Sequence, residues 1–465
     1  MTDFVRLAGR ERPFVEPEKP MQNPGPVQPS LRIASIDVGG GTTDLMITTY
    51  YIEQNRALVP CQTFREGFRI AGEDVLREVI QQMLVPAIVR HLEKCGVMRA
   101  REFLVDRFGS DRANMAEQDK HLRRQYVLRV LKPAGLALLA AFEAAKEPQF
   151  ALVESRTIGE LLSFGKQKGA PFTGRIADYV DVAAAEWGAR GFRLAEVEVP
   201  IEFERIRSAV ASTLGEVFDN ISEAVHHFDC DLVLLSGRPT RLPATIDLFV
   251  NKLAVAPDRV IPLSNYPPGD WYPFGGSSRF PIGDPKTATV VGCMLCLLAE
   301  RQITNFTLYT HRLAMRSTAN YIGVMERDGK IRSSNVLFSS VDGEHAAAPQ
   351  EAKVNWFAPT QIGFRQLPLE RWVATLLYRI KPVDGLSAQG IQRPIVATLE
   401  RELPDELADY ESKNFSALEA MKEELRIVEA TARDGANVTR SFGLVLDTLG
   451  GEEAYWLDTG ILNVS

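Results

Sequence analysis

Three consecutive glycines, Gly39–Gly41, lie between two segments with the composition of β-strands. The apolar run LRIASID precedes them, and the β-branched and aromatic run LMITTYYI follows shortly after. Glycines in a turn let backbone N–H groups approach phosphate oxygens closely, because no Cβ stands in the way. The segment IDVGGGTTDL therefore predicts a strand–turn–strand hairpin that can bind phosphate. The alternative is an ordinary hairpin turn in which glycine only supplies a positive φ.

The side chains around this turn are of types that bind phosphate and a metal ion. The hydroxyls of Thr42 and Thr43 can donate to phosphate oxygens, and Asp37 and Asp44 can hold Mg²⁺ through water, because Mg²⁺ keeps much of its hydration. Other glycine-rich phosphate motifs fit poorly. The chain has no GxGxxG ahead of a helix and no GxxxxGK[ST] with its lysine.

Three further motifs follow the turn in the chain. Residues 71–74 (AGED) open a helix, residues 143–146 (EAAK) lie in a helical region, and residues 231–243 (DLVLLSGRPTRLP) combine a buried strand with a glycine turn. A closing helix begins near Pro285. In their order and spacing, these motifs resemble the second lobe of the ATPase superfamily of actin, heat-shock chaperones and sugar kinases.

That resemblance implies an α/β fold, an actin-like (ribonuclease H-like) ATPase lobe that binds ATP and Mg²⁺. Glu143 and Lys146 would grip the ribose hydroxyls, Gly237 would approach the α-phosphate or ribose, and Arg241 would stack on the base. The expected nucleotide-binding set is Asp37, Gly39, Gly40, Gly41, Thr42, Thr43, Glu73, Glu143, Lys146, Gly237 and Arg241, with Asp37 and Asp44 at the metal.

The chain departs from the chaperone pattern at Glu147, Arg238, Pro239 and Lys286, all at positions expected to face the nucleotide. These departures support a second hypothesis, a protein-interaction scaffold or effector with a vestigial nucleotide site. A phosphotransferase of the sugar-kinase branch is a third, although no residue resembles the base that would activate a substrate hydroxyl.

The composition along the chain predicts three regions. Residues 1–29 are rich in proline and charge and are expected to be a linker. Residues 30–300 form the lobe, with a helical insertion over about 76–195, and residues 301–465 form an α+β accessory domain. A charged helix is expected over 405–432 and a final β-like pair over 440–449 and 453–464. Cys293 and Cys296, in the apolar run VVGCMLCLLAE, are expected to be buried on a core helix.

The segments FREGFRIAGED, LDTL and YWLDTG, at 64–74, 446–449 and 455–460, extend the resemblance. Together with the phosphate turn they are similar to the C-terminal half of the SrfB family of bacterial virulence factors. This implies that the first ATPase lobe comes from an upstream half or another chain, and that residues 301–465 meet a protein partner. The residues that activate water would lie in that missing lobe, so no catalytic residue is expected here and ATP hydrolysis would need both lobes.

Charge and hydropathy exclude two classes of partner. A net charge of -7 and a pI near 5.6 argue against nucleic acid, which requires clustered Lys and Arg. No stretch reaches the roughly 18 apolar residues of a membrane span. Five cysteines, an odd and small number, fit a reducing compartment, so the cytoplasm is expected, with non-classical secretion left open.

Overall fold

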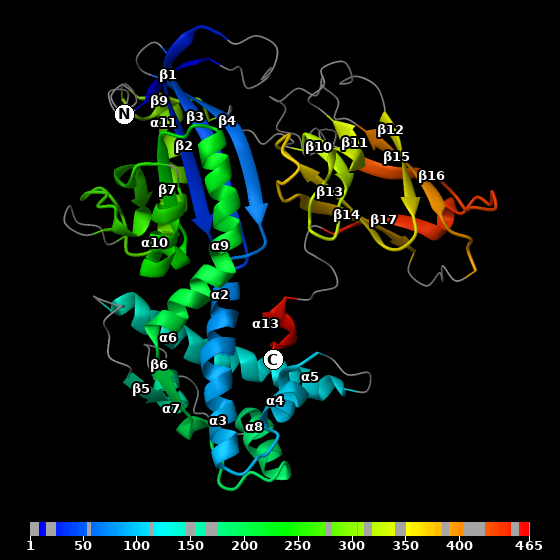
Figure 1. Cartoon of the computed structure of the whole chain (residues 1–465). Coiled ribbons are helices and arrows are strands. Elements are labelled where there is room, and N and C mark those ends of the chain that lie inside the picture. Colours follow the sequence, from blue (N-terminus) through cyan, green and yellow to red (C-terminus); the bar gives the residue numbers. More distant parts are fainter. Residues whose placement is uncertain are drawn as a thin grey trace. The chain divides into compact units, whose positions relative to one another are not determined.

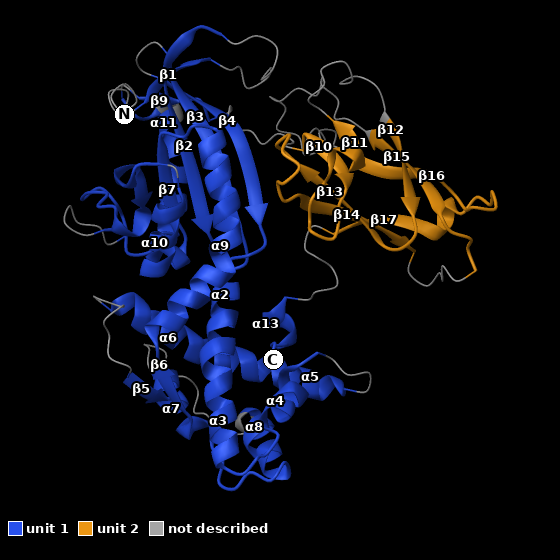
Figure 2. Cartoon of the chain, in the orientation of Figure 1, with its two compact units in different colours: residues 1–313, 454–465 blue, residues 314–453 orange. Residues whose placement is uncertain are grey.

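The computed structural model divides the chain into two compact units (Figure 2). Unit 1 comprises residues 1–313 and 454–465, and unit 2 comprises residues 314–453. The sequence had placed this division after residue 300 and had assigned the last residues to the accessory domain. The structure describes residues 9–14, 25–53, 57–110, 115–145, 154–163, 175–253, 255–274, 281–304, 306–310, 319–339, 350–383, 390–402, 424–447 and 455–464.

A mixed sheet of order β8-β7-β2-β3-β4-β9 forms the upper part of unit 1 in Figure 1, and β1 also pairs with β2. The first three long strands, β2 to β4, run antiparallel, as the predicted hairpin requires, whereas β7 runs parallel to β2 and β8 parallel to β7. The strands are β1 (Arg10–Pro13), β2 (Val27–Val38), β3 (Thr43–Glu53), β4 (Ala57–Phe68), β7 (Leu232–Ser236), β8 (Val260–Pro262) and β9 (Thr307–Leu308).

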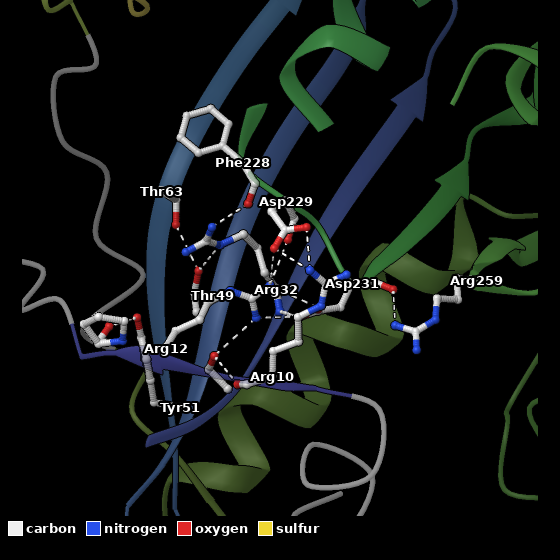
Figure 3. A network of polar contacts seen from close by, with 12 residues as sticks. Arg10, Arg12, Arg32, Thr49, Tyr51, Thr63, Phe228, Asp229, Asp231 and Arg259 are labelled. Carbon is white, nitrogen blue, oxygen red and sulfur yellow. Dashed lines mark hydrogen bonds and ion pairs between the residues drawn. The ribbon is translucent and has the colours of Figure 1, made fainter. Parts of the chain in front are cut away.

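Strand β1 lies within the stretch that the sequence predicted as a linker, so the linker prediction is wrong there. Its residues are charged, and ion pairs attach it to the sheet. Arg12 donates to both carboxylate oxygens of Asp231, at 2.7 and 3.0 Å, and Arg10 reaches the same carboxylate at 3.1 Å (Figure 3). The partner residue is 219 positions away in the sequence, which explains why local composition did not reveal this strand.

Helices pack against the sheet of unit 1. The longest, α9 (Phe203–His227), presents apolar residues at helical spacing and lies beside α10 (Pro243–Lys252), where Phe218 and Phe249 stack with ring centroids 3.7 Å apart. The last long helix of the unit is α11 (Thr287–Arg301), which contacts β9.

The helical part of unit 1 lies between β4 and β7, close to the predicted insertion. Two of its long helices contain a π-helical turn shortly before a proline, Pro86 or Pro133, whose missing N–H interrupts the normal ladder. The elements are α2 (Gly72–Val79), η1 (Ile80–Leu84), α3 (Val85–Lys94), α4 (Ala100–Phe108), α5 (Glu117–Tyr126), η2 (Val127–Leu131), α6 (Lys132–Ala144), β5 (Glu154–Thr157), α7 (Ile158–Ser163), α8 (Arg175–Glu186), η4 (Leu194–Glu196) and β6 (Glu198–Ile201).

Unit 2 consists, in its described residues, of antiparallel strands and short 3₁₀ turns. The sheets β11-β10-β13-β14-β17 and β12-β15-β16 share one apolar core, in which the indole of Trp356 donates to the Ile380 carbonyl at 3.0 Å. The strands are β10 (Tyr321–Val324), β11 (Val336–Ser339), β12 (Gln350–Trp356), β13 (Thr360–Arg365), β14 (Thr375–Pro382), β15 (Ile395–Glu402), β16 (Glu424–Thr431) and β17 (Phe442–Leu446). In the described residues of both units, the remaining 3₁₀ turns are η5 (Arg238–Arg241), η6 (Pro257–Arg259), η7 (Leu263–Asn265), η9 (Ser333–Asn335) and η10 (Thr439–Ser441).

Two predictions for the last third of the chain are wrong. The end of the predicted charged helix, Glu424–Thr431, is strand β16, because pairing with β15 overrides its helical propensity; its earlier residues, 405–423, lie outside the described residues. The second member of the predicted β-like pair forms a short helix, α13 (Trp456–Thr459), in unit 1.

Candidate functional site

The Gly39–Gly41 turn is fastened to the start of helix α2. The Gly39 amide donates to the Thr42 carbonyl at 2.8 Å, which closes the turn. The carbonyls of Gly39 and Gly40 accept hydrogen bonds from the amides of Gly72 and Glu73, at 3.0 and 2.8 Å. Within the described residues, the amides of Gly40 and the exposed Gly41 have no acceptor. Free amides in a rigid turn are donors that suit an anion.

The two threonines of the motif have different environments. Thr43 is buried, and its hydroxyl donates to the Ile70 carbonyl at 2.7 Å, so it anchors the turn to the end of β4. Thr42 is exposed, and its hydroxyl donates to Asp44 at 3.1 Å. Of the two hydroxyls, the one on Thr42 is the one in reach of a ligand.

Asp37 and Asp44 face each other across the β2–β3 ladder, and both side chains are exposed. Like charges directly opposite each other are unfavourable in a sheet, and a bound cation would relieve the repulsion. The described residues contain no group of three or more His, Cys, Asp or Glu side chains placed to hold a metal directly. Two facing carboxylates therefore suit a hydrated Mg²⁺ better than a fully protein-bound ion.

Gly237 lies against this pair at the end of β7. Its φ is 89°, in the left-handed region, and a Cβ there would be 2.0 Å from the Val38 carbonyl oxygen and 2.7 Å from Asp37 Oδ1. No other residue fits this close approach. The parallel strands β2 and β7 thus end side by side, with Asp37 and Gly237 together at their carboxyl ends.

Glu73 and Lys132 form an ion pair of 3.2 Å beside the turn, and each side chain is about a quarter exposed. A Cβ on Gly40 would lie 3.8 Å from the Glu73 side chain, so this pair borders the turn. Lys132 was not predicted. It is the first residue of α6 and lies 59 positions after Glu73, a separation at which no sequence pattern connects them.

Glu143 and Arg241, which the sequence assigned to the ribose and the base, form an ion pair with each other. Arg241 also donates to the Gly283 carbonyl at 2.8 Å, and Pro239 lies close to Gly72. The structure therefore brings together the turn, the start of α2, the end of α6 and the loop after β7. Lys146 lies outside the described residues.

The SrfB virulence factor family matches the chain over residues 4–463. The chain therefore belongs to the SrfB family of virulence factors. No curated protein matches it. None of the helices in the described parts of the chain has the length and apolar character needed to cross a membrane.

Proposed function

We propose that unit 1 is the ATP- and Mg²⁺-binding lobe of an actin-like nucleotide switch within this virulence factor. The observation that carries the proposal is the convergence of the Gly39–Gly41 turn, Gly237 and the Glu143–Arg241 pair at one place. They meet at the carboxyl ends of β2 and β7, and in open α/β sheets ligands bind outside the carboxyl ends of parallel strands. The order of the sheet, an antiparallel β2–β3–β4 meander continued by parallel β7 and β8, also supports it, since a ribonuclease H-like core has this topology.

Each group has a task in this proposal. The amides of Gly40 and Gly41 donate to phosphate oxygens, and Lys132 offsets part of the phosphate charge. Asp37 and Asp44 would hold Mg²⁺ through water. When bound, the ion would neutralise phosphate charge, and Asp37, Asp44 and the glycine amides would bind and orient the phosphates.

Binding of the adenosine part of the nucleotide requires side chains to move. Arg241 must leave Glu143 before it can stack on a base and free Glu143 for a ribose. The side chains are 37% and 22% exposed, and a partly solvated ion pair contributes only about 0–1 kcal/mol. A nucleotide can therefore displace the pair at little cost.

We also propose that helix α11 contacts a first ATPase lobe, upstream in the same protein or in another chain. Cys293 is exposed on α11, so the prediction of a core helix with buried cysteines is wrong. Val290, Met294 and Leu297 are 62%, 57% and 66% exposed and recur at helical spacing. We define them as the α11 face, which is apolar and carries no charge.

The α11 face begins next to the nucleotide site, because Arg241 donates to the Gly283 carbonyl just before the helix. A lobe that closes over the nucleotide would meet both surfaces at once. We therefore assign the α11 face to the upstream lobe. Leu297→Lys is expected to abolish association with a separately expressed upstream half and to leave the thermal unfolding of this chain unchanged. Unchanged association would refute this assignment.

The first test of nucleotide binding is thermal unfolding of the chain with millimolar ATP or ADP and Mg²⁺. A ligand at 100 times its Kd stabilises the folded state by about 2.7 kcal/mol. Asp37→Ala is expected to remove this shift, whereas Asp258→Ala, at an exposed residue of η6, is expected to keep it. If wild type shows no shift, alone or with the upstream half added, the proposal is wrong.

A second candidate function is a protein scaffold with a vestigial site. The Glu143–Arg241 pair favours it, because both groups already satisfy each other without a nucleotide. The scaffold hypothesis expects association with the upstream half to be the same with and without ATP, and in Asp37→Ala. Association that depends on ATP would exclude it.

A further inference from the structure

Residues 455–464 return from the end of unit 2 to unit 1 and dock on its helical part. Trp456 and Leu457 are buried there, and α13 contacts α5 (Figure 1). The helix ends at Gly460, whose φ of 71° is left-handed. A Cβ at this position would lie 3.0 Å from backbone atoms of Arg123 and Arg124. The segment therefore packs directly against the backbone of α5.

Polar contacts fix the segment along its length. They join it to α4, α5 and η1, and one of them, from the Leu462 amide, links main chain to main chain. The contacts are Arg123 Nε to the Thr459 carbonyl at 2.8 Å, Arg124 to Asp458 at 3.2 Å, the Leu462 amide to the Phe108 carbonyl at 2.8 Å, and Gln81 Nε2 to the Asn463 carbonyl at 2.9 Å. The first residue of the segment, Tyr455, is thus positioned by a docked element.

The hydroxyl of Tyr455 lies at the glycine turn. It is 3.9 Å from the position that a Cβ on Gly41 would take, and the side chain is 38% exposed. Glu73 is at a similar distance, 3.8 Å, from the corresponding point on Gly40. A hydroxyl can donate to a phosphate oxygen, whereas a carboxylate can only accept. Tyr455 therefore places a hydroxyl donor beside the Gly40 and Gly41 amides, which have no acceptor among the described residues.

We propose that Tyr455 is a further ligand-binding residue of this site and that its hydroxyl donates to the phosphate chain of the bound nucleotide. The proposal rests on the nucleotide-binding function proposed above and adds a dependence on residues 455–464. Because these residues hold Tyr455 at the turn, loosening them weakens nucleotide binding without any change in the turn itself. The C-terminal YWLDTG motif then has a role at the site.

The test compares wild type with Tyr455→Phe in the full chain, by calorimetric titration with ATP–Mg²⁺, ADP–Mg²⁺ and adenosine. Phenylalanine keeps the ring and removes only the donor. Loss of a hydrogen bond to a charged group is expected to raise the Kd of both nucleotides about tenfold. Adenosine has no phosphate, so its Kd is expected to stay the same. Tyr266→Phe, at another exposed tyrosine of unit 1, is the matched control and is expected to bind like wild type.

The outcomes separate the two proposals. If wild type binds ATP, Asp37→Ala does not, and Tyr455→Phe binds as tightly as wild type, the role of Tyr455 is refuted and nucleotide binding stands. If wild type binds no nucleotide, both are refuted. A second variant, Gly460→Val, is expected to loosen residues 455–464, seen as faster hydrogen exchange of their amides, and to weaken ATP binding. Faster exchange with unchanged ATP affinity would also refute the role of the segment.

Discussion

Replacing Asp231 with asparagine tests how the sheet of unit 1 is held together at the end opposite the glycine turn. The Asp231 side chain is fully buried and accepts hydrogen bonds from Arg12, at 2.7 and 3.0 Å, and from the Arg32 amide at 2.8 Å, with Arg10 at 3.1 Å (Figure 3). Removing one partner of a buried ion pair costs about 3–5 kcal/mol, because the other charge stays buried without its partner. Asp231→Asn is therefore expected to lower the unfolding free energy of unit 1 by about 3 kcal/mol or more.

The neighbouring Asp229 provides a matched control. It pairs with the same Arg10, but its side chain is 61% exposed, and exposed ion pairs contribute about 0–1 kcal/mol. Asp229→Asn is expected to lower the unfolding free energy by less than about 1 kcal/mol.

Urea unfolding followed by far-ultraviolet circular dichroism at the helical band measures both changes, since all α-helices in the described residues lie in unit 1. The double variant Arg12→Leu/Asp231→Leu removes both charges and is expected to be more stable than Asp231→Leu alone. Equal losses for Asp231→Asn and Asp229→Asn would show that burial does not set the strength of this network, and would refute the reasoning.

Two further changes test backbone strain and pH dependence. Gly237→Ala is expected to destabilise unit 1 by about 1–3 kcal/mol, because Gly237 has a positive φ and the new Cβ would meet the Val38 carbonyl. The control is Gly283→Ala, which has open space around its new Cβ and is expected to leave the unfolding free energy nearly unchanged in the same urea titration. Burial raises the pKa of Asp181 to about 6, so the folded chain keeps a proton that the unfolded chain loses from about pH 4. The unfolding free energy is thus expected to fall by about 1–2 kcal/mol between pH 4 and 7, and Asp181→Asn to remove this part of the fall; identical pH profiles would contradict the shift.

The parts of the fold that follow local patterns could be predicted from the sequence. The β2–β3 hairpin follows from an apolar run, three glycines and a β-branched run, and β7 from the apolar run before Gly237. Helix α2 begins at Gly72, where the sequence predicted a helix to begin, because an acidic first turn favours a helix N-terminus.

Other features depend on contacts between distant residues and leave no local pattern. The charged strand β1 exists because Arg12 meets Asp231, and Lys132 and Tyr455 reach the site only through the tertiary fold. Helix α11 shows a different limit. Its apolar spacing is the same whether a helix is buried by its own domain or by a partner, so the sequence could not predict that Cys293 is exposed.

The docking of residues 455–464 has a consequence for the order of events during synthesis. The ribosome makes residues 314–453 between the two parts of unit 1. The helical part of unit 1 therefore cannot form its contacts with Trp456 and Leu462 until unit 2 has left the exit tunnel. Contacts this distant in sequence form late, because the intervening chain must first be closed into a loop. A nascent chain that stalls within unit 2 would carry the glycine turn without Tyr455, and its helical part would expose the apolar surface that Trp456 covers, which a chaperone or protease can recognise.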